Sequence, residues 1–168
     1  MEVFAKPGAA AIIVNNINGI SHILIQDRFK PEAPSESGLI EIPSGKIREF
    51  ESIFDCIRRE VMEETGLEVT EIQGEKESIV YSNHNYKVLN YEPFTCAQNT
   101  QGYYPIMVEV FLCRAKGDLL KISEEAKNLR WFSLKDLESL LLNNENDFYP
   151  MHLVALKKYL YRSLTKKS

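Results

Sequence analysis

The sequence predicts an α/β fold, and three observations support this expectation. Short apolar runs bounded by turn-forming residues are typical of strands, and they occupy the first 45 residues and return between residues 79 and 115. Residues 50–64 instead carry apolar side chains with the 3.6-residue period of a core-facing helix. Two further helical segments, from Ser133 and from Pro150, close the chain.

The composition indicates one domain over residues 1–168. A chain of 168 residues with 44% hydrophobic and 26% charged residues can bury a full-sized core. A formal charge of −4 and a pI near 5.5 argue against a nucleic-acid-binding protein, which normally has a basic patch or stripe. A small anionic molecule, held locally by a few cations or by a metal ion, is compatible with this charge.

Cysteine usage and hydropathy predict a cytoplasmic protein without membrane association. Cys56, Cys96 and Cys113 are odd in number, widely spaced and without a CxxC pair, so neither a disulfide framework nor a zinc site is expected. The apolar run "AAAIIV" at 9–14 is shorter than the core of a signal peptide or a membrane span. We interpret it as a buried strand.

The first elements are predicted to be strands. "AAAIIV" and "HILIQD" (22–27) flank "NNINGI", whose Asn and Gly residues favour a turn, so the pair is expected to form a hairpin. "KPEAPSESG" (30–38) is rich in Pro, Ser and Gly and is expected to be a surface loop. "LIEI" (39–42) is a short strand that ends at Pro43.

Strands are expected again in the second half, followed by the two helices. The strand-like runs are "SIVY", "YKVLNY" and "IMVEVFLC", and a loop over 92–105 separates the last two. Loops of that length in compact domains are often lids or binding loops. The first C-terminal helix begins with a capping-box-like Ser133-x-x-Asp136, and the second begins at Pro150.

Between these two groups of strands, residues 50–64 are predicted to be an amphipathic helix. Its apolar stripe consists of Phe50, Ile53, Phe54, Ile57 and Val61. Gly66 follows at the position where a left-handed residue ends a helix, which puts Glu63 and Glu64 in the last turn.

The carboxylates at this helix end are unfavourable without a counter-charge. Each opposes the helix dipole by about 0.3–1 kcal/mol, and Glu60 and Glu64 are also like charges four residues apart. Glu64 lies inside the apolar stripe and Glu60 at its edge, so both are expected to face the sheet. A bound Mg²⁺ or Mn²⁺ would remove these penalties, because such ions prefer hard oxygen ligands. The alternative is a solvated helix end paired with Arg58 and Arg59.

The spacing G-x5-E-x7-R-E-V-x-E-E-x-G-L resembles the Nudix box at every defining position. It is formed by Gly45, Glu51, Arg59, Glu60, Val61, Glu63, Glu64, Gly66 and Leu67. A chance occurrence in a chain of this length is on the order of 10⁻⁷. The "LIEIPSGK" lead-in and the "EEAKNLRWFSLKDL" segment also look like the family. The resemblance implies a Nudix-type α/β/α sandwich with a mixed central sheet.

The resemblance also implies an enzyme. Nudix hydrolases cleave a nucleoside diphosphate linked to another moiety X, by attack of water on phosphorus with Mg²⁺ or Mn²⁺. Carried onto this sequence, Glu60 and Glu64 are the leading metal ligands, Glu63 is a third or water-mediated ligand, and the carbonyl of Gly45 is a backbone ligand. Arg59 is expected to orient the glutamates, a role that suits an arginine fork flanked by carboxylates.

The general base implied by the resemblance is a glutamate outside the box. Glu125, six residues before Trp131, matches a spacing that is common in the family. Glu109 and Glu60 are the competing candidates. Glu124 and Glu125 can equally be a solvated pair at a turn.

The lead-in favours an ADP-ribose or NDP-sugar substrate over a nucleoside triphosphate. Against that subgroup, residues 68–92 lack a proline that it usually carries downstream of the box. The expected substrate contacts are Arg28, Glu41, Tyr103 and Tyr104. Tyr103, Tyr104 and Phe94 either stack a base or pack within their loop.

Two other functions stay open at this point. One is a pyrophosphohydrolase that cleans the nucleoside-triphosphate pool. The other is a non-catalytic ligand sensor on the same fold, although such proteins typically lose box glutamates and this sequence keeps them all. In each case the expected partner is a small nucleotide-derived molecule, and a homodimer is one option for the assembly.

Overall fold

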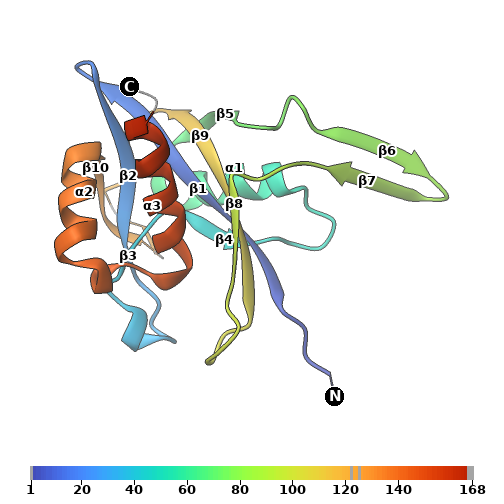
Figure 1. Cartoon of the computed structure of the whole chain (residues 1–168). Helices are drawn as coiled ribbons and strands as arrows, with labels where there is room; N and C mark the ends of the chain where they lie inside the picture. Colours follow the sequence, from blue (N-terminus) through green and yellow to red (C-terminus); the bar gives the residue numbers. More distant parts are fainter. Residues whose placement is uncertain (1, 122, 125, 166–168) are drawn as a thin grey trace.

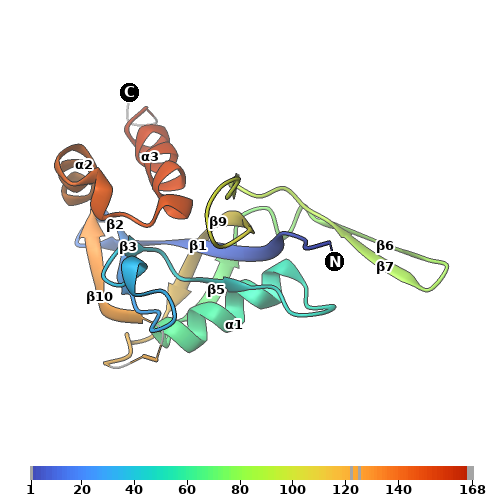
Figure 2. The ribbon, with the colours of Figure 1, turned by 90° about the horizontal axis from the view of Figure 1, so that it is seen from below.

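A mixed β-sheet with helices on both faces forms the body of the protein (Figure 2). The computed structural model of the chain describes residues 2–121, 123–124 and 126–165. Within these residues the sheet has eight strands: β1 (Lys6–Ile17), β2 (Ile20–Arg28), β3 (Ile40–Glu41), β4 (Ser44–Lys46), β5 (Glu68–Ile72), β8 (Thr95–Gln98), β9 (Ile106–Lys116) and β10 (Ala126–Ser133). The main path is β10-β2-β1-β9-β5, with β3 paired to β2, β4 to β1 and β8 to β9. β1 and β9 are parallel and the other pairs antiparallel, which makes the sheet mixed.

Three α-helices of the described chain cover the two faces of this sheet. They are α1 (Ile53–Thr65), α2 (Leu134–Asn143) and α3 (Pro150–Thr165), and short 3-10 helices span Pro34–Glu36 and Glu145–Asp147. α1 lies on one face, and α2 and α3 lie on the other (Figure 2). The expected α/β/α sandwich with a mixed central sheet is therefore confirmed.

β1 supplies apolar side chains to both layers, because side chains alternate across a strand. Ala9, Ala11 and Ile13 belong to the core under α1, whereas Ala10 and Ile12 belong to the core under α2 and α3. All five are almost completely buried. The "AAAIIV" run is thus a strand buried on both faces, as predicted.

The predicted N-terminal hairpin and the two C-terminal helices are confirmed. Asn18 and Gly19 join β1 to β2, and their positive φ angles of 53° and 80° suit a tight hairpin turn. Ser133 caps α2 by accepting a hydrogen bond from the backbone N–H of Asp136 at 3.1 Å. α3 begins at Pro150. Within the described residues, no helix is long and apolar enough to cross a membrane.

Phe50 is not part of the apolar stripe of α1, so this part of the prediction was wrong. The N-cap of α1 is Ser52, whose hydroxyl accepts from the N–H of Asp55 at 3.1 Å, and the helix starts only after it. Phe50 lies in the preceding turn, with a φ of 57°, and is fully exposed. Its neighbour Glu51 turns inward to pair with Arg59, which leaves Phe50 pointing outward.

The segment 92–105 is not one long loop, because it contains β8, which pairs with β9. The irregular parts are 92–94 before β8 and 99–105 before β9. β5 was not predicted either. It has two buried positions, Val69 and Ile72, which are too few to reveal a period in the sequence.

The remaining two strands form a hairpin that stands apart from the main sheet. β6 (Ile79–Asn83) and β7 (Tyr86–Asn90) pair only with each other among the described residues. Figure 1 shows this ribbon projecting away from the body of the molecule.

Candidate functional site

The end of α1 determines where the three box carboxylates lie. Gly66 adopts the left-handed conformation (φ 78°) and its N–H donates to the carbonyl of Met62 at 3.0 Å, which ends the helix as predicted. Glu64 is 3% exposed, and the side chains of Glu60 and Glu63 are 12% and 51% exposed. The predicted inward orientation of Glu60 and Glu64 is therefore confirmed, and Glu63 faces solvent.

The carboxylate of Glu60 lies directly against the backbone of Gly45. A Cβ atom at position 45 would lie 1.9–2.3 Å from the carboxyl atoms of Glu60, so a side chain there and the present Glu60 rotamer exclude each other. Gly45 cannot retreat, because β4 pairs with β1 through the register Gly45 with Ala9. The glycine of the box is thus required by the position of a carboxylate fifteen residues later in the sequence.

Arg59 connects the carboxylates of the box to one another. Its Nε and Nη2 donate to the two oxygens of Glu51 at 2.7 and 2.9 Å, a bidentate pair. Its Nη1 donates to Glu60 and, at 3.2 Å, to Glu63, while Nη2 also donates to the carbonyl of Lys46 at 3.1 Å. The hydrogen bonds from Arg59 lower the pKa of Glu51 to about 2. Arg59 thus links Glu51, in the loop before α1, to Glu60 and Glu63 in the last turns of the helix.

Arg58 does not pair with the box carboxylates. It forms two hydrogen bonds, of 2.8 and 2.6 Å, to Glu75 beyond β5. Among the carboxylates of the last turns, only Glu63 fits the alternative of a solvated helix end. Its side chain is half exposed and pairs with Arg59 and, at 3.6 Å, with Arg48. The alternative does not fit Glu64, which is buried.

Glu64 is buried with two hydrogen-bond donors. Its Oε2 accepts from the Gln26 side chain at 2.9 Å and from the N–H of Ser44 at 3.1 Å. Burial, and then the negative charge of nearby Glu41, raises the pKa of Glu64 to about 8. In the absence of a cation this carboxyl group therefore holds its proton at neutral pH.

Arg28 and Glu41, both expected to contact substrate, have different positions. Arg28 donates to Glu36 at 2.9 Å and to Glu41 at 2.8 Å, and its guanidinium lies 4.1 Å from the centre of the Tyr149 ring. Glu41 is buried and also accepts from Gln26 at 3.3 Å. Burial raises the pKa of Glu41, against the opposing effect of Arg28. Arg28 lines a pocket. Glu41 is not part of the pocket lining and contacts Arg28 from the buried side.

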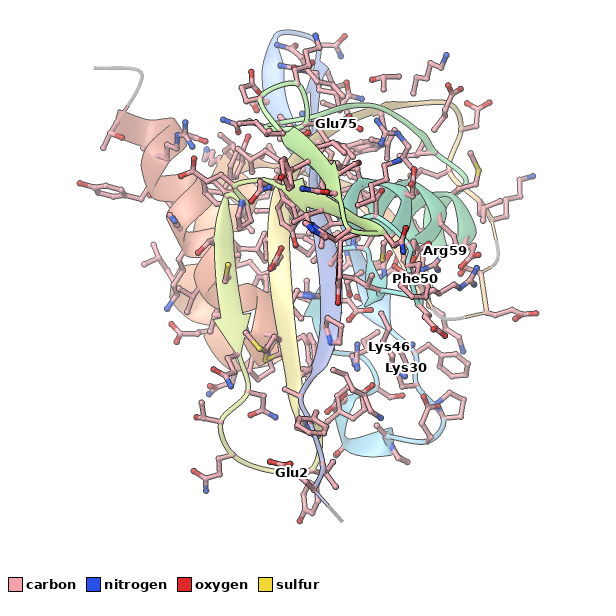
Figure 3. All side chains as sticks on the ribbon, turned by 90° about the vertical axis from the view of Figure 1, so that its right-hand side faces the viewer. Glu2, Lys30, Lys46, Phe50, Arg59 and Glu75 are labelled. Carbon is pink, nitrogen blue, oxygen red and sulfur yellow. The ribbon has the colours of Figure 1, made fainter. Side chains whose placement is uncertain are left out.

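That pocket has a volume of about 440 Å³ and opens beside Gly45. Its walls include Arg28, Lys30, Ser44, Gly45, Lys46, Tyr103, Tyr104, Tyr149 and His152. Lys30 and Lys46 lie close together on the side of the molecule that carries Arg59 (Figure 3). The pocket therefore combines cationic and aromatic side chains next to the box.

The expected aromatic cluster is reduced to two tyrosines. Tyr103 is fully exposed at the pocket and Tyr104 is half-buried there, with Lys6 and Lys46 near its ring. Phe94 does not line this pocket. It packs instead against the core under α2 and α3, so it cannot stack on a ligand held by the two tyrosines.

Comparison with known proteins decides the family. A family model described as the NUDIX domain matches residues 5–153. The chain belongs to the Nudix family. Glu51 to Leu67 and Gly45 are therefore the Nudix box of this protein.

Solved Nudix structures share the fold. The Ap4A hydrolase of C. elegans, in a binary complex, is 15% identical with a TM-score of 0.57, over 96% of this chain and 99% of that one. The NUDIX domain of Shewanella oneidensis NrtR, complexed with ADP ribose, is 14% identical with a TM-score of 0.62, over 96% and 90%. A MutT/nudix family protein from Enterococcus faecalis is 16% identical with a TM-score of 0.58, over 79% of this chain but 45% of that longer one. At these identities the similarity concerns the fold.

The Nudix box has the donor chemistry for a divalent ion, although its side chains are not gathered around one point. Within the described residues, no three His, Cys, Asp or Glu side chains lie close enough together to hold an ion. Glu60 is turned onto Arg59, and Glu64 is held by its two donors. The carboxylates are nevertheless hard oxygen donors, and the contact of Glu60 with Gly45 brings a carboxylate to the backbone of β4. Glu60 and Glu64 would therefore have to turn away from these partners, or share them, to reach one ion.

Of the candidates for the general base, Glu125 lies outside the described residues, and its role stays a prediction. Glu109 is in β9, in register with Ala9, the neighbour of Gly45 on β1. Its Oε2 is buried without a hydrogen-bond partner. Burial and the hydrogen bond to Glu109 raise the pKa of Tyr91.

Sequence reasoning missed Gln26 and His152. Gln26 shares the α1-facing side of β2 with Leu24, so a polar residue at a core-facing position of "HILIQD" was a signal. His152 lines the pocket from α3, and its Nδ1 accepts from the N–H of Ile42 at 3.3 Å. Burial lowers the pKa of His152 to about 3, so the ring is neutral. Nothing local in the sequence distinguished it from the other histidines.

Proposed function

We propose that this Nudix pyrophosphohydrolase cleaves the diphosphate linkage of a nucleoside diphosphate joined to a second moiety, of the ADP-ribose or NDP-sugar kind. The observation that carries the proposal is the pocket of about 440 Å³ that adjoins the box at Gly45. A ligand with its diphosphate at the box has space there for a second group, between cations and aromatic rings. The fold similarity to a NUDIX domain complexed with ADP ribose and to an Ap4A hydrolase supports the same substrate class.

Four groups of the box are proposed to hold Mg²⁺ or Mn²⁺. They are the side chains of Glu60, Glu63 and Glu64 and the carbonyl of Gly45. When bound, such an ion neutralises the diphosphate and lowers the pKa of an attacking water. Arg59 is proposed to orient Glu60 and Glu63 towards the metal site, because its two hydrogen bonds to Glu51 fix the position of its guanidinium group.

Hydrolysis rates on a panel of substrates test this proposal. We expect kcat/KM for ADP-ribose, an NDP-sugar or a dinucleoside polyphosphate to exceed that for 8-oxo-dGTP or any dNTP by about tenfold, which corresponds to about 1.4 kcal/mol. Turnover should require Mg²⁺ or Mn²⁺ and disappear with a chelator, because the proposed mechanism depends on a water activated by an ion that the box carboxylates hold.

Three outcomes of these assays would contradict the proposal. A triphosphate preferred by about tenfold would assign the protein to nucleotide-pool cleaning. Saturable binding of ADP-ribose without turnover, at every metal tested, would assign it to the non-catalytic sensors. Turnover that survives the chelator would exclude the metal-dependent mechanism altogether.

The general base is a separate prediction. We propose Glu125 for this role, with Glu109 as the alternative that its unpartnered oxygen favours. Glu125→Gln is expected to lower kcat by about 10²–10⁴-fold, with KM nearly unchanged, and to remove the acidic limb of the pH–rate profile. The matched control is Glu124→Gln, the exposed neighbour, which should retain activity. A loss with Glu109→Gln and none with Glu125→Gln would transfer the role to Glu109.

A further inference from the structure

Gln26 is a buried amide placed between two buried carboxyl groups. β2 pairs with β3 through the register Gln26 with Glu41, so these two side chains share one face of the sheet. Leu24, two residues earlier on β2, packs in the core under α1, which identifies this face as the one that the helix covers. Gln26 and Glu41 are almost completely buried there, as is Glu64 at the end of α1. Strand register therefore brings an amide to the most buried carboxylate of the Nudix box.

The two hydrogens of this amide have separate carboxylate acceptors. Nε2 of Gln26 donates to Oε2 of Glu64 at 2.9 Å and to Oε1 of Glu41 at 3.3 Å. The amide oxygen of Gln26 is buried and has no hydrogen-bond partner among the described residues. A buried acceptor without a partner costs free energy, but the reversed amide would place this oxygen against both carboxyl groups. The two carboxyl groups therefore determine the orientation of the amide.

The two carboxyl groups differ in how their oxygens are used. On Glu41, Oε1 accepts from Gln26 and Oε2 accepts from Arg28 at 2.8 Å, so the protein occupies both oxygens. On Glu64, the two donors, Gln26 and the backbone N–H of Ser44 at 3.1 Å, both bind Oε2. Within the described part of the chain, no hydrogen bond reaches Oε1 of Glu64. Glu64 thus has one fixed oxygen and one oxygen without a partner, whereas Glu41 has none to offer.

Glu64 is held at the strand that Glu60 also reaches. Its Oε2 accepts from the N–H of Ser44 in β4, and the carboxylate of Glu60 lies against Gly45, the next residue of that strand. The two box carboxylates therefore meet β4 at neighbouring residues. Because its donors occupy only one oxygen, Glu64 can bind an ion there without giving up either of them.

We propose that Gln26 is a positioning residue for the metal site, which holds Oε2 of Glu64 and leaves Oε1 as the one oxygen that this side chain offers to Mg²⁺ or Mn²⁺. The inference rests on the proposed function, in which Glu64 is a metal ligand. A carboxylate with two unbound oxygens rotates about its last bond, whereas two donors on one oxygen fix the direction of the other. Side chains that hydrogen-bond to metal ligands orient them in this way, and their loss typically weakens metal binding by about 10–100-fold.

The affinity for Mn²⁺ tests the role of Gln26 independently of turnover. Gln26→Met keeps the length of the side chain and removes both donors. Its Kd for Mn²⁺, measured from the EPR signal of the free ion, should rise by about tenfold or more. The kcat should fall at limiting Mn²⁺ and recover in part at saturating Mn²⁺, with KM for the substrate nearly unchanged, because Gln26 does not line the pocket. The matched control is Leu24→Met, on the same face of the same strand, which removes no donor and should bind Mn²⁺ like the wild type.

A crystal structure of the wild-type protein with Mn²⁺ tests the assignment of the two oxygens, and it does not depend on the folding of a variant. One oxygen of Glu64 should contact the ion while the other keeps its hydrogen bond to Gln26. Both oxygens on the ion, or a Gln26 side chain turned away from Glu64, would overturn the inference, as would a Gln26→Met protein with the Mn²⁺ affinity of the wild type. In those cases the proposed function still stands. A wild-type protein without measurable affinity for Mn²⁺ would overturn both.

Discussion

Glu64→Gln is expected to lower kcat by at least about 10²–10³-fold. Glu64 is the most buried of the box carboxylates, so the charge that it offers to a metal is the least compensated by water. Gln keeps the shape and one acceptor oxygen for the N–H of Ser44, but it has no charge. Steady-state kinetics at saturating Mg²⁺ and Mn²⁺ measure the loss, and metal titration calorimetry measures the weakened binding.

The same variant should change how the metal-free stability depends on pH. In the folded protein the pKa of Glu64 is raised to about 8 from an ordinary value of 4.5, so the folded state binds the proton more tightly than the unfolded state. The free energy of unfolding is therefore highest below about pH 4.5 for this group, and falls as pH rises towards 8. The fall is of the order of a few kcal/mol. Glu64→Gln should remove it, and the variant should be at least as stable as the wild type at pH 8.

Urea titrations of both proteins from pH 5 to about pH 9, with chelator present, check this expectation. Glu41, whose pKa burial also raises, interacts with Glu64, so the difference between the two curves measures the titration of Glu64 together with its coupling to Glu41. Glu68→Gln removes an exposed carboxylate on β5 and should reproduce the wild-type curve. A Glu64→Gln protein that is less stable than wild type at pH 8 would mean that the carboxylate stabilises the fold, contrary to its proposed role in metal binding.

Gly45→Ala is expected to reduce kcat/KM by about 10²-fold or more, because displacements of about 1 Å in an active site have effects of this size. The new methyl group would lie 1.9 Å from the carboxyl carbon of Glu60, and β4 is held to β1 by its ladder. Glu60 must therefore leave its position. Stability should change little, because Glu60 can rotate towards solvent without leaving a cavity in either core.

A double-mutant cycle separates this mechanism from a general disruption of the loop. If Gly45→Ala acts through Glu60, it should have little further effect in a Glu60→Gln background, and the two losses should not add. The measurement is kcat/KM of the wild type, both single variants and the double variant, with circular dichroism to confirm folding. Fully additive losses would indicate that Gly45 acts independently of Glu60.

The local elements of the site could be predicted from the sequence, because their causes are local. The end of α1 at Gly66, the cap of α2 by Ser133 and the turn between β1 and β2 depend on residues within a few positions of one another. The spacing of Glu60 and Glu64 on one helix was sufficient to predict that both turn inward. Glu60 and Glu64 are also two positions of the Nudix box, whose complete spacing identified the family. The α/β/α sandwich then came from that resemblance, since β5 and β10 carry too little pattern to be predicted.

Only the tertiary structure decided which residues meet at that helix. Gln26 reaches Glu64 across 38 residues of sequence, and it does so because β2, β3 and β4 bring separate strands over the end of α1. The pocket likewise joins segments near residues 28, 45, 104 and 149. Phe50 points outward because its neighbour Glu51 turns inward to form an ion pair with Arg59. Strand register and the pairing of buried charges are set by the whole core at once, and no short window of sequence contains the partners that determine them.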